Sequence, residues 1–245
     1  MRTILFSCKH NQILPYFAHL FNKYYDDNME VIVLSPEELP VLPDNFSHFK
    51  LSSFSRSWVN DISEFFDQFQ DDYFFSLMQD HFLYASVQKD ILKEAEKLIQ
   101  ENSNIYKFGC RIGPIPNIPR WALDSPNMNF GSYLDTKFSS PCPVKQSLLP
   151  SLWKTKWFKI LLDYSKNYSA WEWELRPKTT TPYLLEPEIR ELIKDKQFLF
   201  YQTPEVFPCI DLIRGGADNY SEWSQLVQDK DDIDTFSEAR KAVFN

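Results

Sequence analysis

Glycine is scarce in this sequence, with only five among 245 residues. The sequence contains no GxGxxG or GxxxxGK[ST] phosphate loop, no GxSxG nucleophile elbow and no HExxH pair. Each of these motifs places the residues for one chemistry, such as a cradle of backbone N–H groups for phosphate or an activated serine. Their absence disfavours Rossmann dehydrogenases, P-loop enzymes and α/β hydrolases.

Paired cysteines and long apolar runs are also missing. The four cysteines, Cys8, Cys110, Cys142 and Cys209, include no CxxC pair and no spacing typical of a zinc site. No apolar stretch is long enough to span a bilayer, and residues 1–3 lead directly into a short apolar run without a signal peptide of normal length. The sequence therefore predicts reduced thiols, a cytoplasmic location and no transmembrane segment.

Positive charge is in deficit. The 26 Lys and Arg residues against 34 Asp and Glu residues give a formal net charge of -8. Nucleic-acid-binding proteins usually present a basic face that releases counterions from phosphate, so we expect no nucleic-acid partner. A local basic pocket for one small anion is compatible with this net charge. With 43% hydrophobic residues, the chain can build one sizeable core, which predicts a single domain over residues 1–245.

The N-terminal half alternates short apolar runs with helical patterns. The runs Thr3–Cys8, Val31–Leu34 and Tyr73–Leu83 predict strands. Apolar side chains at helical spacing around Phe17 and again after Ser57 predict helices, the second with Ser57 as its N-cap. This alternation predicts an α/β fold with a mostly parallel sheet flanked by helices.

The second half begins with an irregular, proline-rich segment from Pro114 to Pro150. Long irregular segments in compact domains are often binding surfaces, so we expect substrate contacts there. Periodicity returns at Leu152–Tyr164, which predicts a helix, and Phe198–Tyr201 predicts a strand. Two helices follow, and the capping-box pattern Thr235–Glu238 predicts the start of the last one.

Asp80 ends the apolar run that begins at Tyr73, and His81 follows it. In an alternating α/β protein, ligands bind at the carboxyl ends of the strands, so a carboxylate there is well placed to hold a metal ion or a diphosphate. The alternative is that Asp80 caps a helix or forms a turn, as aspartates after strands commonly do.

A second acidic site is the segment Trp171–Glu174, in which tryptophans alternate with glutamates. An indole face packs well against the apolar face of a sugar ring while a carboxylate accepts hydrogen bonds from its hydroxyl groups. The alternative is that Trp171 and Trp173 pack in the core and that both glutamates are exposed.

These elements resemble small GT-A fold glycosyltransferases of bacterial and large-virus polysaccharide pathways. The resemblance lies in the order of the elements, in the segment Gln79–Leu83 and in Trp171–Glu174. Proteins of that family often have a strand ending in Asp-Asp-aromatic-aromatic-Leu and, later, a tryptophan-acid-aromatic-glutamate element. The resemblance implies a GT-A-like, Rossmann-related sheet with a nucleotide-sugar-binding half, residues 1–112, and an acceptor-binding half, residues 113–245.

The resemblance implies transfer of a sugar from a nucleotide diphosphate sugar to a saccharide hydroxyl. Asp80 matches the first acid of the family's metal motif, and His81 stands where the second acid is usual. A divalent cation, Mn²⁺ or Mg²⁺, is the implied cofactor, and an imidazole ligand would favour Mn²⁺. Glu174 matches the family's final glutamate and is the implied base for the acceptor hydroxyl, with Glu172 as the alternative.

The remaining implied contacts follow from position and charge. Ser7 and Cys8 end the first strand and are expected near the nucleotide, while Arg111 or Arg214 would neutralise the leaving diphosphate, with or without a cation. Trp171 and Trp173 would contact the acceptor. The alternative function is a non-catalytic carbohydrate-binding or interaction protein on a degenerate transferase scaffold.

Overall fold

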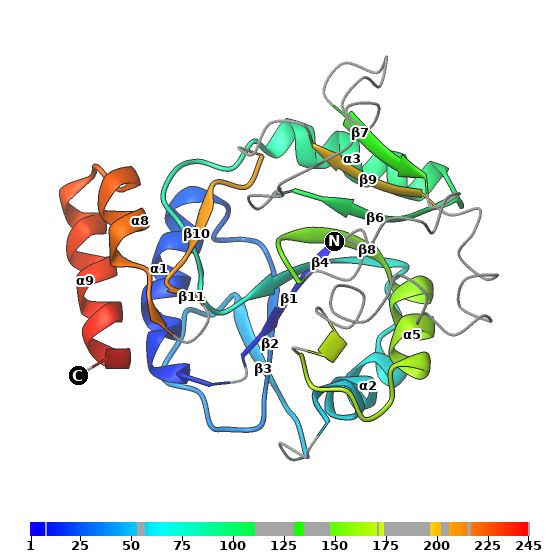
Figure 1. Cartoon of the computed structure of the whole chain (residues 1–245), viewed down its shortest axis with the longest axis horizontal. Helices are drawn as coiled ribbons and strands as arrows, with labels where there is room; N and C mark the ends of the chain where they lie inside the picture. Colours follow the sequence, from blue (N-terminus) through cyan, green and yellow to red (C-terminus); the bar gives the residue numbers. More distant parts are fainter. Residues whose placement is uncertain are drawn as a thin grey trace.

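Eight strands form one mixed sheet in the part of the chain that the structure describes (Figure 1). This computed structural model describes residues 1–7, 9–52, 57–110, 130–134, 148–170, 172–173, 197–201, 206–214 and 217–244, with the backbone alone at 130–134, 197–201 and 214. The strand order is β3-β2-β1-β4-β8-β6-β9-β7. The bounds are β1 (Arg2–Phe6), β2 (Val31–Ser35), β3 (Phe46–Lys50), β4 (Tyr73–Met78), β6 (Ile105–Gly109), β7 (Phe130–Leu134), β8 (Ser151–Lys154) and β9 (Gln197–Tyr201).

All of these strands except β7 and β8 run in one direction. β1 pairs in parallel with β2 and β4, β2 with β3, and β6 with β9. β8 lies antiparallel between β4 and β6, and β7 is antiparallel to β9 at the far edge. The predicted mostly parallel α/β sheet is therefore confirmed. Strands from both predicted halves of the chain build this one sheet.

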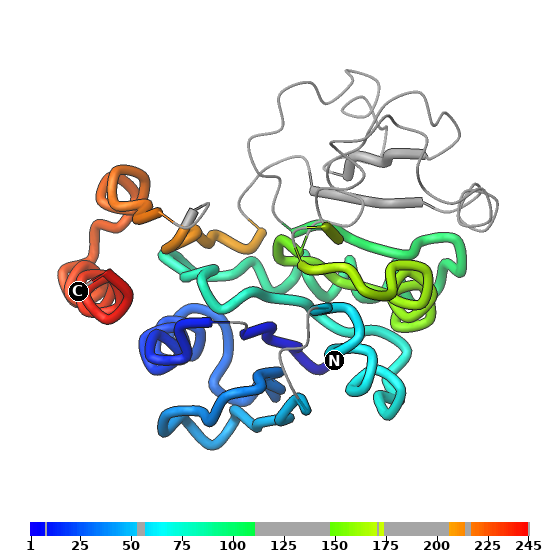
Figure 2. Tube along the Cα trace, turned by 60° about the horizontal axis from the view of Figure 1, so that its bottom comes forward, coloured from blue at the N-terminus to red at the C-terminus, as the bar shows by residue number. Residues whose placement is uncertain are grey.

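Helices cover both faces of the sheet (Figure 1). α1 and α3 pack over one core cluster, and α2 and α5 pack over the other. α8 and α9 lie outside α1 at the C-terminal end of the chain (Figure 2). The bounds are η1 (Asn11–Ile13), α1 (Leu14–Tyr24), α2 (Trp58–Gln68), α3 (Lys89–Glu101), α5 (Thr155–Tyr164), α8 (Tyr220–Leu226) and α9 (Lys230–Phe244). Across the described ranges, no helix has the length and apolar character needed to cross a membrane.

β4 divides its apolar side chains between the two cores. Phe74 faces α2 and α5, where its ring centroid lies 5.0 Å from that of Phe66 and 5.1 Å from that of Phe158. Phe75 and Leu77 face the opposite way and join the cluster under α1 and α3. Burial on both faces explains why this strand appears in the sequence as a continuous apolar run.

We expect Phe74→Ala to lower the free energy of unfolding by about 3–5 kcal/mol, because the substitution removes a fully buried ring and leaves a cavity among other aromatic rings. Denaturant titration measures this difference. Phe244→Ala is the control, since that side chain is 38% exposed and its loss should change the free energy by less than about 1 kcal/mol. Equal effects of the two substitutions would contradict the packing described for β4.

The run Tyr73–Leu83 is two strands, not the single strand predicted. β4 ends at Met78, residues 79–80 form a turn, and β5 (His81–Leu83) leaves the main sheet to pair antiparallel with β10 (Cys209–Asp211). The predicted helix Leu152–Tyr164 likewise begins with a strand, because β8 occupies residues 151–154 before α5 starts. Short apolar runs do not distinguish a buried strand from the first turn of a helix.

The helix starts were predicted with mixed success. Ser57 is the N-cap of α2 as predicted, because its hydroxyl accepts a hydrogen bond from the Asn60 N–H. The prediction that α9 begins at Thr235 is wrong. α9 begins at Lys230, the Asp229 carboxylate accepts hydrogen bonds from the N–H groups of its first turn, and the Thr235 hydroxyl donates to the Asp231 carbonyl inside the helix.

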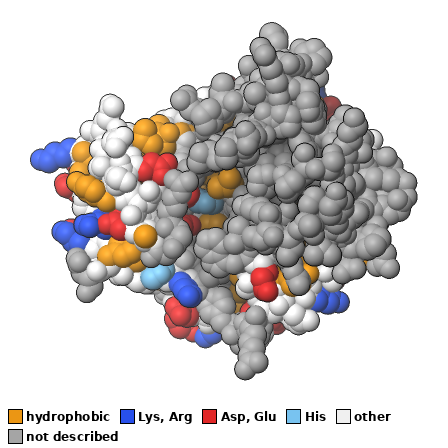
Figure 3. All heavy atoms as spheres, in the orientation of Figure 1, with side chains coloured by type: hydrophobic (Ala, Val, Ile, Leu, Met, Phe, Trp, Pro, Cys, Tyr) orange, Lys and Arg blue, Asp and Glu red, His pale blue; other side chains and the backbone are white. Residues whose placement is uncertain are grey.

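α9 is attached to α1 through the Asp232 carboxylate, which is completely buried. Lys23 Nζ lies 2.7 Å from Asp232 Oδ1, and the Tyr24 hydroxyl donates to the other carboxylate oxygen. The hydrogen bond that Lys23 donates to Asp232 raises the pKa of the Lys23 ammonium group. Acidic and basic side chains lie interspersed on the surface at this end of the molecule (Figure 3).

Cys110 and Cys209 are the cysteines whose surroundings the structure describes. Both are buried and neither forms a disulfide. Burial raises the pKa of the Cys110 thiol, which keeps it protonated and unreactive.

Candidate functional site

Asp80 lies in the turn that directly follows β4, at the carboxyl end of a central strand of the sheet. Its side chain is half-buried. The neighbouring strands β1 and β2 run parallel to β4, so their carboxyl ends meet the same edge. In open α/β sheets this edge is the one that binds ligands.

The Asp80 turn is tied to the loop after β1. The Gln79 backbone N–H donates to the Phe6 carbonyl over 3.2 Å, and the Gln79 side-chain amide donates to the Lys9 carbonyl. Asp80 therefore sits next to the β1 loop, the segment that the sequence predicts to be near a nucleotide. Cys8, which belongs to that prediction, lies outside the described residues.

Ser7 has a structural partner at this edge. Its side chain is 1% exposed, and its hydroxyl donates to Asn11 Oδ1 over 2.5 Å. The Asn11 amide in turn donates to Ser35 Oγ at the end of β2 over 2.9 Å. This buried polar network holds the ends of β1 and β2 together, so Ser7 supports the loop after β1 from within the protein.

Asp211 is a carboxylate that sequence reasoning did not select. β10 pairs with β5 so that Asp211 lies opposite His81, and the Leu212 N–H donates to the Asp80 carbonyl over 2.8 Å. The side chain of Asp211 is 24% exposed. The segment Cys209–Asp211 shows the same change from apolar residues to an acid that drew attention to Asp80, but over only three residues.

His81 lies between the end of β4 and Asp211, and it is 5% exposed. Its Nδ1 accepts a hydrogen bond from the Met78 N–H over 3.2 Å. Its Nε2 lies 3.7 Å from Asp211 Oδ1. Both ring nitrogens therefore face protein groups.

Asn219 fixes the segment that carries Asp211. Its side-chain amide donates to the Asp211 carbonyl and to Glu222 Oε2, each over 2.8 Å. Its backbone N–H donates to the Leu212 carbonyl over 3.2 Å. The carboxyl end of β10 is thus held both by the Asp80 turn and by the start of α8.

Arg214 follows closely, in the two-residue strand β11 (Ile213–Arg214), which pairs with β12 (Ala217–Asp218). Its backbone thus lies three positions beyond Asp211. Arg111, the other predicted cation for the diphosphate, lies outside the described residues.

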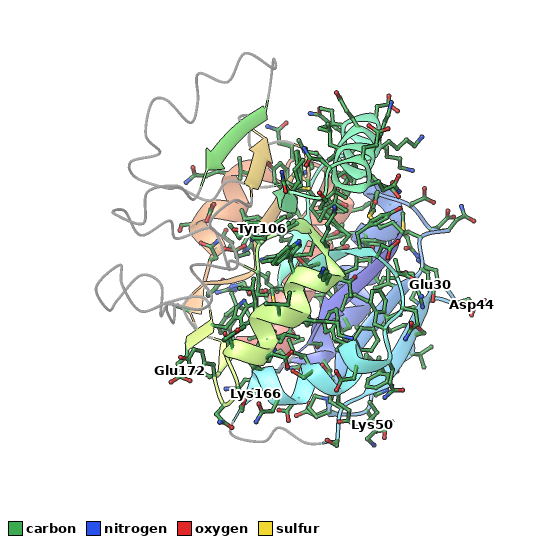
Figure 4. All side chains as sticks on the ribbon, turned by 90° about the vertical axis from the view of Figure 1, so that its right-hand side faces the viewer. Glu30, Asp44, Lys50, Tyr106, Lys166 and Glu172 are labelled. Atoms are coloured by element: carbon green, nitrogen blue, oxygen red, sulfur yellow. The ribbon has the colours of Figure 1, made fainter. Side chains whose placement is uncertain are left out.

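Glu172 belongs to a capping box. Its Oε2 accepts hydrogen bonds from the Ser169 N–H over 2.8 Å and from the Ser169 hydroxyl over 3.0 Å, while the Glu172 N–H donates to Ser169 Oγ over 3.2 Å. Figure 4 shows Glu172 at the surface of this part of the chain. Its carboxylate thus already has a role in the local backbone. Glu174 lies outside the described residues.

Trp173 is a core residue. It is 1% exposed, and its ring centroid lies 6.1 Å from that of Trp58 and 5.6 Å from that of Phe158. This is the packing alternative considered for the Trp171–Glu174 segment. A ring enclosed in this way offers no face to a sugar. Trp171 lies outside the described residues.

The described residues also line a pocket of about 380 Å³ at the amino end of β4. Its walls come from β4, α3 and the start of α5. Lys154, one of the lining residues, donates from Nζ to the Asn102 carbonyl over 2.7 Å. Asp80 follows the other end of β4, so this pocket is separate from the candidate site.

The carboxylates of Asp80 and Asp211 are suitable ligands for a divalent cation. Mg²⁺ and Mn²⁺ prefer oxygen donors, and Mg²⁺ in phosphate-handling sites is often held by one or two carboxylates together with phosphate oxygens. Among the described side chains there is no group of three or more His, Cys, Asp or Glu residues arranged to hold a metal ion. Two carboxylates alone do not complete the coordination shell of either ion.

Comparison by sequence gave no relatives: no protein-family model matches the chain, and no curated protein matches it. The chain is similar in structure to several solved proteins. Residues 1–349 of TarS from S. aureus match with a TM-score of 0.46 and 12% identity, over 71% of this chain and 53% of that one. The alignment thus spans about half of the TarS fragment, which has also been solved with UDP-GlcNAc.

Two further matches extend over nearly the whole chain. A cytidylyltransferase from Leptospira borgpetersenii matches with a TM-score of 0.46 and 13% identity, over 100% of this chain and 98% of that one. The mannosyltransferase PcManGT from Pyrobaculum calidifontis, solved with GDP-Man and Mn²⁺, matches with a TM-score of 0.47 and 11% identity, over 98% of this chain and 69% of that one. The strand order and the separate β5–β10 pair define a mixed, mostly parallel α/β fold.

Proposed function

We propose that this protein is a glycosyltransferase that moves a sugar from a nucleotide diphosphate sugar to a hydroxyl group of a saccharide acceptor. The observation that carries the proposal is the position of Asp80, in a turn at the carboxyl end of β4, between the β1 loop and Asp211. The motif resemblance of Gln79–Leu83 and Trp171–Glu174 supports the same reaction.

In this proposal Asp80 would hold a divalent cation beside the diphosphate of the donor. The cation, when bound, neutralises charge that develops on the diphosphate as the sugar leaves. Arg214, close along the chain to Asp211, and Arg111 are the proposed cationic side chains for the same diphosphate. Ser7 supports the nucleotide-facing loop through Asn11.

We assign the base for the acceptor hydroxyl to Glu174. A base must lie within hydrogen-bond reach of the proton that it removes. The involvement of Glu172 in a capping box with Ser169 favours Glu174 for this task. Trp171 is the proposed aromatic contact of the acceptor, since Trp173 is enclosed in the core. Residues 1–112 would then supply most of the donor site, joined by Arg214, and the rest of residues 113–245 would serve the acceptor.

Thermal unfolding with nucleotide diphosphates and Mn²⁺ tests the proposal. A ligand present at a hundred times its dissociation constant stabilises a folded protein by about 2.7 kcal/mol. For a chain of this size that corresponds to a rise in Tm of about 5–10 °C. We expect such a rise with one of UDP, GDP or CDP together with Mn²⁺, followed by sugar transfer from the matching nucleotide sugar. Binding without transfer would support the non-catalytic alternative, and no shift with any of them would contradict donor binding.

The need for a cation is a separate prediction. We expect the affinity for the best nucleotide diphosphate, measured by calorimetric titration, to fall at least about tenfold when excess EDTA replaces Mn²⁺, because two carboxylates otherwise face the diphosphate and repel it. The same titration with magnesium in place of manganese is the control for metal identity. Undiminished affinity in EDTA would leave Asp80 without a cation and would assign diphosphate binding to Arg111 and Arg214.

A further inference from the structure

The surroundings of His81 decide what its imidazole can bind. A neutral imidazole has one nitrogen that carries a proton and one that carries a lone pair. The Met78 N–H points at Nδ1 over 3.2 Å, so Nδ1 supplies the lone pair and the ring proton sits on Nε2. A ring in this state has no remaining lone pair for a cation.

The proton on Nε2 faces Asp211. Nε2 lies 3.7 Å from Asp211 Oδ1, so the N–H of a neutral ring lies beside the carboxylate, and the strand pairing of β5 with β10 keeps the two residues opposite each other. His81 is buried, whereas the Asp211 side chain is 24% exposed. The imidazole therefore contacts the carboxylate on its buried side, while the carboxylate still reaches solvent.

The backbone of Asp211 is held in the same place by independent contacts. Asn219 donates to the Asp211 carbonyl, and the next residue, Leu212, donates to the Asp80 carbonyl. These hydrogen bonds fix the backbone of β10 beside the Asp80 turn. The contact with His81 Nε2 is made by the Asp211 carboxylate itself.

We propose that His81 is a positioning residue and not a metal ligand, and that it holds Asp211 beside Asp80 as the second carboxylate of the donor site. This inference rests on the proposed function, because it assumes that a cation and a diphosphate bind at Asp80. Asp211, from β10, thus supplies the second carboxylate, which in the resembled family comes from an acid at the position of His81. The protein ligands of the cation are then all oxygen atoms, and Mg²⁺ should bind nearly as well as Mn²⁺.

A double-mutant cycle tests whether His81 acts through Asp211. The Kd of Mn²⁺ is measured by calorimetry for the wild type, His81→Leu, Asp211→Asn and the double variant. Each titration contains an excess of the nucleotide, UDP, GDP or CDP, that raises the Tm most. We expect Asp211→Asn to weaken Mn²⁺ binding at least about tenfold, and His81→Leu to weaken it about tenfold, as loss of an orienting partner typically does. The double variant should bind as Asp211→Asn does, since His81 then has no carboxylate to orient.

His81→Gln provides the conservative rescue. Its amide keeps one acceptor and one donor, so we expect Mn²⁺ affinity within about threefold of the wild type. The rescue should disappear in the Asp211→Asn background. Two outcomes would show instead that His81 is itself a ligand and would overturn the proposal. One is that the effects of His81→Leu and Asp211→Asn on the Kd of Mn²⁺ multiply in the double variant. The other is a fivefold or greater preference for Mn²⁺ over Mg²⁺ that is lost in His81→Gln.

Matched controls separate this inference from the proposed function. Asp72→Asn changes a carboxylate at the other end of β4 and should leave Mn²⁺ affinity unchanged. Thermal unfolding of each variant without ligand establishes that it is folded. If His81→Leu does not fold, His81→Gln takes its place as the test variant. If Asp80→Asn abolishes Mn²⁺ binding and Asp211→Asn does not, the inference is wrong while the proposed function stands. Absence of Mn²⁺ and nucleotide binding in the wild type would overturn both.

Discussion

Asp80→Asn is expected to lower the affinity for a nucleotide diphosphate in the presence of Mn²⁺ by about a hundredfold, or about 2.7 kcal/mol, because it removes the charged ligand of a site that shares its cation with the diphosphate. Asn is nearly the same size as Asp and keeps one oxygen donor, so the turn after β4 should retain its shape. Calorimetric titration of the variant and the wild type under identical salt measures the change.

The control for Asp80→Asn is the same titration in EDTA. If Asp80 acts through the cation, the variant should bind the nucleotide at least as well as the wild type once the cation is removed, because it has one carboxylate fewer to repel the diphosphate. Asp72→Asn, at the amino end of the same strand, should match the wild type in both conditions. A variant that binds as tightly as the wild type in Mn²⁺ would assign Asp80 to the turn-forming role that an aspartate after a strand often has.

Glu174→Gln is expected to reduce the rate of sugar transfer by about a thousandfold while changing donor affinity by less than about twofold, since a general base acts on the acceptor hydroxyl and its loss is felt in the chemical step. Steady-state kinetics with the nucleotide sugar identified by thermal unfolding measure kcat. Titration of the nucleotide diphosphate measures donor binding in the same preparation.

Glu172→Gln is the matched control, two positions away in the same segment. Gln at the third helical position also forms a capping box, so we expect activity within about twofold of the wild type and a stability loss of no more than about 1 kcal/mol. If Glu172→Gln abolishes transfer and Glu174→Gln does not, the base is Glu172, and the capping contact would have to break when the acceptor binds.

Much of the N-terminal half of the fold was predictable from the sequence, because its strands and helices depend on local patterns. β1, β2 and β4 are buried on both faces, which requires continuous apolar runs, and α1 and α2 repeat apolar side chains at helical spacing. The N-cap at Ser57 was predictable for the same reason, since the bond it forms spans only three residues.

Errors occurred where one local pattern has two structural solutions. Leu152 and Trp153 are apolar neighbours that fit either a strand or the start of a helix, and only their pairing with β4 and β6 makes them a strand. The pattern Ser/Thr-x-x-Glu occurs both at Ser169–Glu172, where it is a capping box, and at Thr235–Glu238, where it lies inside α9. The tertiary contacts of each segment decide between the two.

The sequence by itself determined that Asp80 follows a buried strand of an alternating α/β fold, because the apolar run and the acid are adjacent in the chain. Only the tertiary structure decided what surrounds Asp80. Asp211 reaches it through the antiparallel pairing of β10 with β5, and His81 faces that carboxylate because the Met78 N–H occupies its Nδ1. Pairing between distant strands depends on register and on closure of the intervening chain, which local periodicity does not encode.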